Sequence, residues 1–146
     1  MKNTKKILVI DDEENTRNAI KRMLHESMPY VCVIESGSSE HTLEIAKAHQ
    51  PDLILLDVLM PKVNGLTVLK TLKESKNREI KKIPVIMITG IGNREVSIKA
   101  KKMGAADYIT KPFNDKIFLL KIKKYMKINQ KNFLKVLKQK SDSKKS

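Results

Sequence analysis

The chain has 146 residues, of which 40% are hydrophobic and 32% are charged, so composition excludes an intrinsically disordered protein and size favours one globular domain. The longest apolar runs have four or five residues, which excludes a membrane-spanning helix. The basic start MKNTKK precedes only four apolar residues, too few for a signal peptide, and the single Cys32 cannot form an internal disulfide. We therefore expect a cytoplasmic protein.

The net charge of +14 is concentrated near the C-terminus. Residues 114–146 contain 11 lysines and two acidic residues, whereas residues 1–113 carry a net charge of +5. Such a basic end could bind nucleic acid or an anionic membrane. Few aromatic residues lie among the lysines and no DNA-reading motif is visible, so a solvated lysine-rich helix with a frayed end is the simpler interpretation.

Five apolar runs predict β-strands. In chain order they cover residues 7–10, 31–34, 53–57, 85–89 and 108–110. Apolar residues at helical spacing predict a helix after each strand. These helices carry Ala19, Ile20, Met23 and Leu24; Thr42, Leu43, Ile45 and Ala46; Leu66, Val68, Leu69 and Leu72; Val96, Ala100 and Met103; and Phe118, Ile122 and Tyr125.

The helix boundaries have their own signals. Pro29 marks the end of the first helix, Gly65 opens the third, and Gly104 is placed to end the fourth. A polar stretch from Lys73 to Lys82 is predicted to connect the third helix to the fourth strand. Alternation of strands and helices predicts an α/β fold with a parallel sheet, right-handed crossovers and helices on both faces.

Polar side chains stand where the predicted strands end. Asp11 and Asp12 follow the first strand, Asp57 ends the third, Thr89 ends the fourth, and Lys111 follows the fifth. In a doubly wound sheet these strands can lie side by side, so the five side chains are expected at one edge, where ligands bind in open α/β sheets.

Three carboxylates and one lysine leave an excess of about two negative charges, which a divalent cation would compensate. An all-oxygen, partly open site suits Mg²⁺, with Mn²⁺ as a substitute. Taken alone, Asp12 could instead cap the following helix. Asp57 could also act as a nucleophile that forms an aspartyl phosphate, with the metal and Lys111 neutralising phosphoryl charge and the Thr89 hydroxyl bonding a phosphoryl oxygen.

Four segments together resemble the receiver domain of two-component response regulators. They are ILVIDDE (7–13), LILLDVLMPKVNGL (53–66), PVIMITG (84–90) and GAADYITKPF (104–113), and the resemblance covers roughly residues 4–126. It implies a flavodoxin-like, three-layer (βα)5 fold with a five-stranded parallel sheet in the order 2-1-3-4-5.

The resemblance also implies residue roles. Asp57 would take a phosphoryl group from a histidine kinase or phosphotransfer protein. Asp12, Asp57 and the backbone carbonyl of Leu59 would bind Mg²⁺ directly, and Asp11 would bind it through water. Thr89 and Lys111 would contact the phosphoryl group, and the Lys111–Pro112 peptide bond would be cis. The domain would be a signalling switch that performs only self-phosphorylation and self-dephosphorylation.

Tyr108 matches the family's aromatic switch position, although it could also be an ordinary half-buried strand residue. Phosphorylation would draw Thr89 inward, let Tyr108 follow, and remodel the surface formed by the fourth helix, fifth strand and fifth helix. Apolar residues around Ile98 and in the run 117–120 could serve a homodimer there, or could be scattered surface residues.

Departures from the family pattern are mild. Gly90 stands where the family more often has alanine, which should leave the phosphoryl site open. Leu59 and Ile91 are apolar where side chains that handle water sometimes stand. Neither can orient a hydrolytic water through a polar group, so we expect slow to moderate self-dephosphorylation.

The receiver domain is expected to cover residues 1–126, followed over 127–146 by a basic helical extension and disordered tail. About 20 residues are too few for a folded output domain. The chain could be a stand-alone receiver or the receiver and linker of a longer protein. Other interpretations are an aspartate-nucleophile Mg²⁺ phosphatase, a degenerate receiver used as a binding module, and a nucleic-acid binder acting through the tail. Adjacent Asp11 and Asp12, in place of an Asp-x-Asp pair, disfavour the phosphatase.

Overall fold

The computed structural model describes residues 4–60, 63–90 and 94–127. Its elements in chain order are β1 Lys5–Ile10, α1 Glu14–Ser27, β2 Val31–Ser36, α2 Thr42–His49, β3 Leu53–Asp57, α3 Gly65–Lys73, α4 Arg78–Lys81, β4 Val85–Thr89, α5 Arg94–Lys102, β5 Asp107–Thr110 and α6 Asp115–Tyr125. All strand pairs are parallel and the order is β2-β1-β3-β4-β5, which confirms the predicted sheet.

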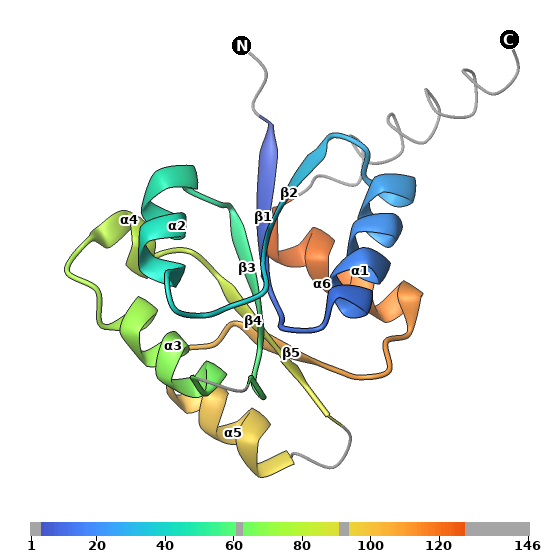
Figure 1. Cartoon of the computed structure of the whole chain (residues 1–146). Helices are drawn as coiled ribbons and strands as arrows, with labels where there is room; N and C mark the ends of the chain where they lie inside the picture. The colour runs from blue at the N-terminus through green and yellow to red at the C-terminus, as the bar shows by residue number, and fades with distance from the viewer. Residues whose placement is uncertain (1–3, 61–62, 91–93, 128–146) are drawn as a thin grey trace, which may run out of the picture.

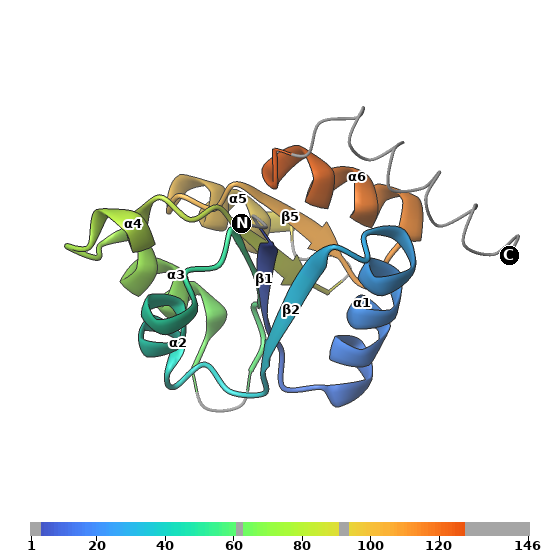
Figure 2. The same cartoon turned by 90° about the horizontal axis from the view of Figure 1, so that it is seen from above.

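The sheet forms the middle of three layers (Figure 1). Helices α1 and α6 cover one face, and α2, α3, α4 and α5 cover the other, as the view from above also shows (Figure 2). Alternate residues of the central strands feed two separate cores. Ile7, Val9, Leu53 and Leu55 pack with α1 and α6, whereas Leu8, Ile10, Ile54 and Leu56 belong to the opposite core. Burial on both faces explains the continuous apolar runs of β1, β3 and β4.

One helix was not predicted. The polar stretch 73–82 contains the short helix α4, Arg78–Lys81, because the side chain of Asn77 accepts hydrogen bonds from the backbone N–H groups of Glu79 and Ile80. Ile80 is buried and joins the core beneath α2 and α3. An N-cap residue three positions before an isolated apolar residue was the available signal.

The other predicted boundaries agree with the structure. Gly104 has a φ of +106°, the left-handed conformation that glycine supplies after a helix, and it lies two residues beyond the end of α5 at Lys102. Among the described residues, none of the helices is long and apolar enough to cross a membrane.

Candidate phosphoryl and metal site

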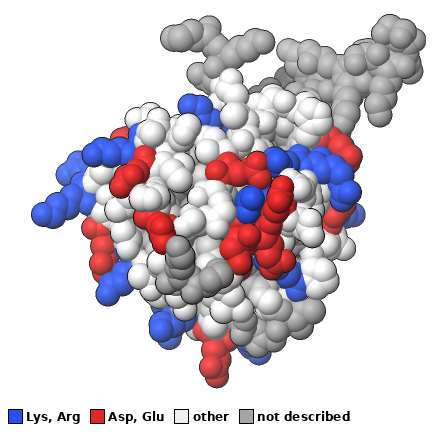
Figure 3. All heavy atoms as spheres, viewed as in Figure 1, with Lys and Arg blue, Asp and Glu red and all other residues white. Residues whose placement is uncertain are grey.

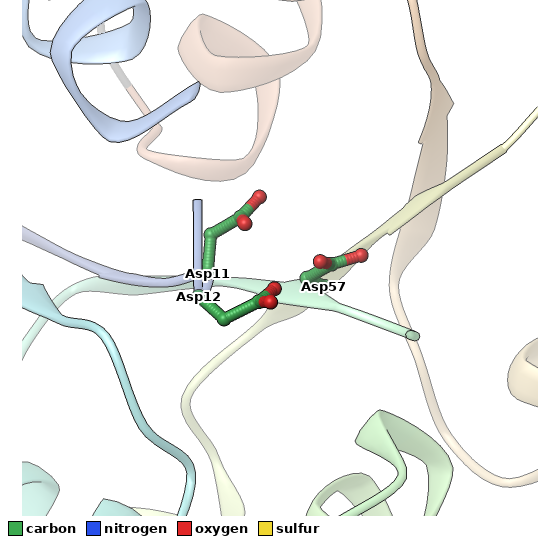
Figure 4. A group of neighbouring side chains, drawn as sticks. All are labelled: Asp11, Asp12 and Asp57. Carbon is green, nitrogen blue, oxygen red and sulfur yellow. The ribbon is translucent and has the colours of Figure 1, made fainter. Parts of the chain in front are cut away.

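The register of the sheet brings the acidic residues together. β1 and β3 are neighbours, with Ile10 beside Leu56, so the residues that follow each strand meet at one edge. The carboxylate oxygens of Asp11, Asp12 and Asp57 lie within 4.8 Å of one another. Asp11 and Asp57 are buried and Asp12 is exposed. Figure 4 shows the three side chains around a common space.

Asp11 is fixed by its local backbone. Its Oδ1 accepts a hydrogen bond of 2.9 Å from the N–H of Glu13, and its own N–H donates to the carbonyl of Ser36 in β2. The N-cap residue of α1 is Glu13, with no side-chain capping bond. The interpretation of Asp12 as a helix cap is therefore wrong, and its carboxylate faces the acidic cluster.

Asp57 lies where the end of β3 meets the start of α3. Its Oδ1 accepts a 3.3 Å hydrogen bond from the N–H of Leu59, whose side chain is exposed. Gly65 donates its N–H to the carbonyl of Val58 at 2.8 Å. A Cβ atom at Gly65 would collide with the backbone of Asp57 and Val58, so glycine permits this close approach of α3 to the strand end.

Lys111 supplies the cation of the site. Its ammonium nitrogen lies 3.0 Å from Oδ2 of Asp11, 3.6 Å from Oδ2 of Asp57 and 3.7 Å from Oε1 of Glu13. Burial by itself lowers the pKa of Lys111, but the close contact with Asp11 and the charges of Asp57 and Glu13 outweigh it and raise this pKa. The Lys111–Pro112 peptide bond is cis, as the resemblance implied.

The crowding of carboxylates acts most strongly on Asp57. Burial and the negative charge of Asp11 raise the pKa of Asp57 to about 6, although Lys111 and the N–H of Leu59 pull it down. A raised carboxyl pKa means that the ionised form is held at an energetic cost, which a nearby cation would relieve.

Thr89 and Tyr108 lie on the neighbouring strands. Thr89 is buried at the end of β4, and its carbonyl accepts the N–H of Lys111 at 2.7 Å. Tyr108 in β5 is half-buried and packs against the core on the α5 side. The ammonium groups of Lys121 and Lys101 lie 5.0 and 6.0 Å from the centre of its ring.

These residues fit a divalent metal ion. The donor set is all oxygen, and exposed Asp12 leaves one side open to water, as suits a hard cation that keeps part of its hydration shell. On the face shown in Figure 3, acidic side chains gather near the centre, with lysine and arginine side chains among and beside them.

Sequence reasoning missed three contributors to the site. Glu13 reaches Lys111, Gly65 was recognised only as a helix start, and Arg17 was not among the candidate residues. Arg17 instead bonds the backbone carbonyl of Asp11 at 2.7 Å. Its position six residues after Asp11, one to two helical turns on, was the only available signal.

A parallel α/β sheet with three carboxylates and a lysine at its carboxyl edge defines a phospho-acceptor type of site. The family model described as "Response regulator receiver domain" matches residues 7–123. The chain belongs to this family, whose members are signalling phospho-acceptors and not classical enzymes. It is a receiver domain of phosphorelay signalling.

Relatives of two lengths are similar to this chain. It is 38% identical over 114 residues to the "Probable transcriptional regulator ycf27" of Cyanophora paradoxa, covering 78% of this chain and 45% of the relative. It is 32% identical over 123 residues to the "Polar-differentiation response regulator DivK" of Brucella ovis, covering 84% and 97%. The chain thus spans less than half of the first relative and almost all of the second.

Among solved structures, the receiver domain of NtrX from Brucella abortus superposes with a TM-score of 0.74 at 27% identity, covering 84% of this chain and 99% of that domain. The chemotaxis protein CheY4 of Vibrio cholerae has the same TM-score at 24% identity, covering 84% and 98%, and supports the fold alone.

Proposed function

We propose that Asp57 is the phospho-acceptor of this domain. The observation that carries this proposal is that Asp57 lies at the sheet edge beside both the acidic pair and Lys111, with its Oδ2 3.6 Å from the ammonium nitrogen. The donor is a phosphohistidine of a kinase or of a phosphotransfer protein. A carboxylate oxygen of Asp57 forms the new O–P bond as the P–N bond to histidine breaks, and the imidazole nitrogen keeps the electron pair.

Mg²⁺, or Mn²⁺ in its place, is the proposed metal. Asp12, Asp57 and the carbonyl of Leu59 would hold it directly, and Asp11 would hold it through water. When bound, the ion supplies positive charge against the phosphoryl oxygens. Lys111 supplies further positive charge from the protein, and its ion pairs with Asp11 and Asp57 keep it within reach of the phosphoryl group.

Thr89 and Tyr108 are proposed to pass the change to the surface. The hydroxyl of Thr89 would donate to a phosphoryl oxygen, and Tyr108 would move into the space that Thr89 leaves. Phosphorylation adds negative charge and hydrogen-bond acceptors at Asp57. In response, strands β4 and β5 and the helices beside them would switch between two conformations. This makes the surface formed by α5, β5 and α6 the proposed output face.

The output face combines apolar and basic side chains. Ile98, Ile117 and Leu120 are exposed, with 48%, 52% and 55% of their surface accessible, and Lys101 and Lys121 lie beside them at Tyr108. A homodimer through this face would bring the lysines of two copies together. We therefore favour a partner segment that carries acidic and apolar residues, and keep the homodimer as the alternative.

The output itself is also a proposal. The chain covers nearly all of DivK but less than half of ycf27, so a stand-alone receiver and a receiver joined to a further domain each have a relative of matching length. The basic extension predicted over 127–146 lies outside the described residues except for Lys127. Nucleic-acid binding through this extension would show a steep dependence of affinity on salt concentration.

Intact-mass spectrometry tests the phospho-acceptor. Incubation with a small phosphodonor and Mg²⁺ is expected to add one phosphoryl group, and the addition should vanish in Asp57→Asn and in the presence of a chelator. Addition of the same group to Asp57→Asn would move the acceptor elsewhere. Rapid multiple turnover of a phosphate ester would instead favour a phosphatase.

A further inference from the structure

Arg17 connects three elements around the acidic cluster. Its Nη1 donates a 2.7 Å hydrogen bond to the carbonyl oxygen of Asp11, and its Nε donates a 3.1 Å bond to Oε1 of Glu35 at the end of β2. Only 16% of its side chain is exposed. The guanidinium group therefore spans from α1 to the ends of β1 and β2 instead of projecting into solvent.

The carbonyl that Arg17 binds belongs to the peptide group between Asp11 and Asp12. The N–H of Asp11 is held separately by the carbonyl of Ser36 in β2. With both backbone groups of Asp11 bonded, the direction in which each of the two carboxylates leaves the chain is restricted. The spacing of these oxygens decides whether a small cation that demands near-ideal geometry can be bound.

Glu35 in turn fixes Arg17. Its second carboxylate oxygen accepts a 2.8 Å contact from Nζ of Lys21, one turn after Arg17 in α1. The hydrogen bond from Lys21 lowers the pKa of Glu35, burial opposes this, and Arg17 lowers it further. Glu35 therefore stays ionised and holds Arg17 in the orientation in which it bonds the carbonyl of Asp11.

We propose that Arg17, held by Glu35, is a positioning residue for the divalent-ion site, acting through the peptide that joins Asp11 to Asp12. This inference rests on the metal site of the proposed function. A lysine could supply the same charge from a single nitrogen but could not bond the Asp11 carbonyl and Glu35 with a planar, rigid fork. Loss of an outer contact of this kind costs about 10- to 100-fold in metal affinity.

The test is calorimetric titration of the metal-free full chain with Mg²⁺, and separately with Mn²⁺. Arg17→Lys keeps the charge and removes the fork, and it is expected to weaken Mg²⁺ binding by about tenfold or more. Arg22→Lys, an exposed arginine on the same helix, is the matched control and should leave the affinity unchanged. Mn²⁺, which tolerates softer and less regular sites, should lose less than Mg²⁺.

Gly37→Ala tests the contact without a change at Arg17, and Arg17→Gln serves a second purpose. A Cβ atom at Gly37 would lie 3.2 Å from Nη1 of Arg17, so Gly37→Ala displaces the guanidinium without changing any charge. Arg17→Gln separates geometry from electrostatics, because removing a cation near the carboxylates would by itself tighten Mg²⁺ binding. Positioning predicts weaker binding in Gly37→Ala and in Arg17→Lys.

The outcomes are distinct. A wild-type chain that binds no Mg²⁺ refutes the metal site of the proposed function. A wild-type chain that binds Mg²⁺, with Arg17→Lys unchanged and Arg17→Gln tighter, overturns only the positioning role. Thermal unfolding of each variant without metal identifies those that are folded at the titration temperature, and a purely structural role would lower their stability without moving the affinity of the folded protein.

Discussion

Lys111 lies closer to Asp11 than to the proposed phospho-acceptor, with its ammonium nitrogen 3.0 Å from Oδ2 of Asp11 and 3.6 Å from Oδ2 of Asp57. In the protein without metal, this lysine compensates two buried carboxylates at once. A divalent cation in the same cluster would compete with it for Asp11. Before phosphorylation, Lys111 and the metal would therefore weaken each other's binding at Asp11, although both would stabilise a phosphoryl group on Asp57.

Lys111→Met should separate these two effects. Removing the ammonium group is expected to tighten Mg²⁺ binding by roughly tenfold, because the carboxylates lose their internal counter-charge, while phosphorylation at saturating Mg²⁺ becomes slower. Calorimetry gives the affinity, and intact-mass time courses give the rate. Lys47→Met, an exposed change on α2, should alter neither quantity. Weaker Mg²⁺ binding in Lys111→Met would contradict the compensation.

Asp57→Asn is expected to stabilise the metal-free protein at neutral pH. The pKa of Asp57 is raised to about 6, chiefly by burial and by Asp11, so its ionised form opposes folding above that pH. The gain should be on the order of 1–3 kcal/mol. Urea unfolding at pH 7.5 measures it, and the difference should shrink towards pH 4 as the wild-type carboxyl gains its proton.

Addition of Mg²⁺ should reverse the order of stability of the wild type and Asp57→Asn. The wild-type protein is expected to gain stability with increasing metal concentration, whereas Asp57→Asn has lost a ligand and should gain less. Equal stabilisation of both proteins by Mg²⁺ would show that Asp57 does not hold the ion.

Gly65→Ala should be among the most damaging small substitutions in the described residues. Its Cβ atom would collide with the carbonyl oxygen of Asp57 and the Cα atom of Val58, and both are backbone atoms that cannot turn aside. We expect a loss of about 2 kcal/mol or more in the free energy of unfolding, together with slower phosphorylation. Gly37→Ala meets only a side chain and should cost much less, as parallel denaturant titrations would show.

The carboxyl of Asp107 is expected to stabilise the folded protein at neutral pH and to lose this effect in acid. Burial raises the pKa of Asp107, but the N–H of Tyr108, the ammonium group of Lys121 and the hydroxyl of Tyr125 lower it by more. Its stabilising effect is present above the ordinary value of 3.8 and is lost as pH falls through the lower folded value.

The variant Asp107→Asn should therefore unfold at lower denaturant concentration at pH 7, and its stability should depend less on pH below 4. Chemical unfolding at intervals from pH 7 to pH 2.5 would measure both. Asp115→Asn, at the exposed start of α6, serves as the control. Parallel stability curves for the wild type and Asp107→Asn would mean that this carboxyl has no special role.

The aspartyl phosphate is expected to persist. The side chain of Leu59 is 66% exposed beside Asp57 and has no polar group to orient an attacking water. We expect a phosphoryl half-life of minutes or longer in the purified protein, and a shorter one in Leu59→Gln. Decay of the phosphorylated mass after removal of the donor gives both values. A wild-type half-life of seconds would refute this prediction. The second position named for this effect, Ile91, lies outside the described residues.

The parallel strands and the meeting of Asp11, Asp57 and Lys111 could be predicted because each depends on a repeating rule, whereas the strand order 2-1-3-4-5 was implied only by the resemblance to receiver domains. Apolar runs identify buried parallel strands, and the residue that follows such a strand lies at the ligand edge. The same rule could not reveal how Asp12 is used. Whether it caps α1 or faces the cluster depends on a few backbone angles, and the structure assigns the N-cap to Glu13.

Contacts made across elements were harder to foresee. Arg17 has the pattern of a solvent-facing helix residue, and only the proximity of β2 turns it towards Asp11 and Glu35. Helix α4 is too short for helical periodicity, so a cap at Asn77 and one buried residue, Ile80, decide it. For Arg17 the determining partners lie in other elements, where local sequence patterns carry no information, whereas for α4 the local signal is limited to this cap and one apolar residue.

Asp12 is exposed, whereas Asp11 and Asp57 are buried, so the acidic cluster meets solvent at Asp12. An arriving cation would meet Asp12 first, and a departing one would leave past it. The phosphodonor would approach from the same side, because the strands behind Asp11 and Asp57 are buried in the sheet. Metal entry and phosphoryl transfer would then share one route, and the molecule that arrives first would determine when the other can enter.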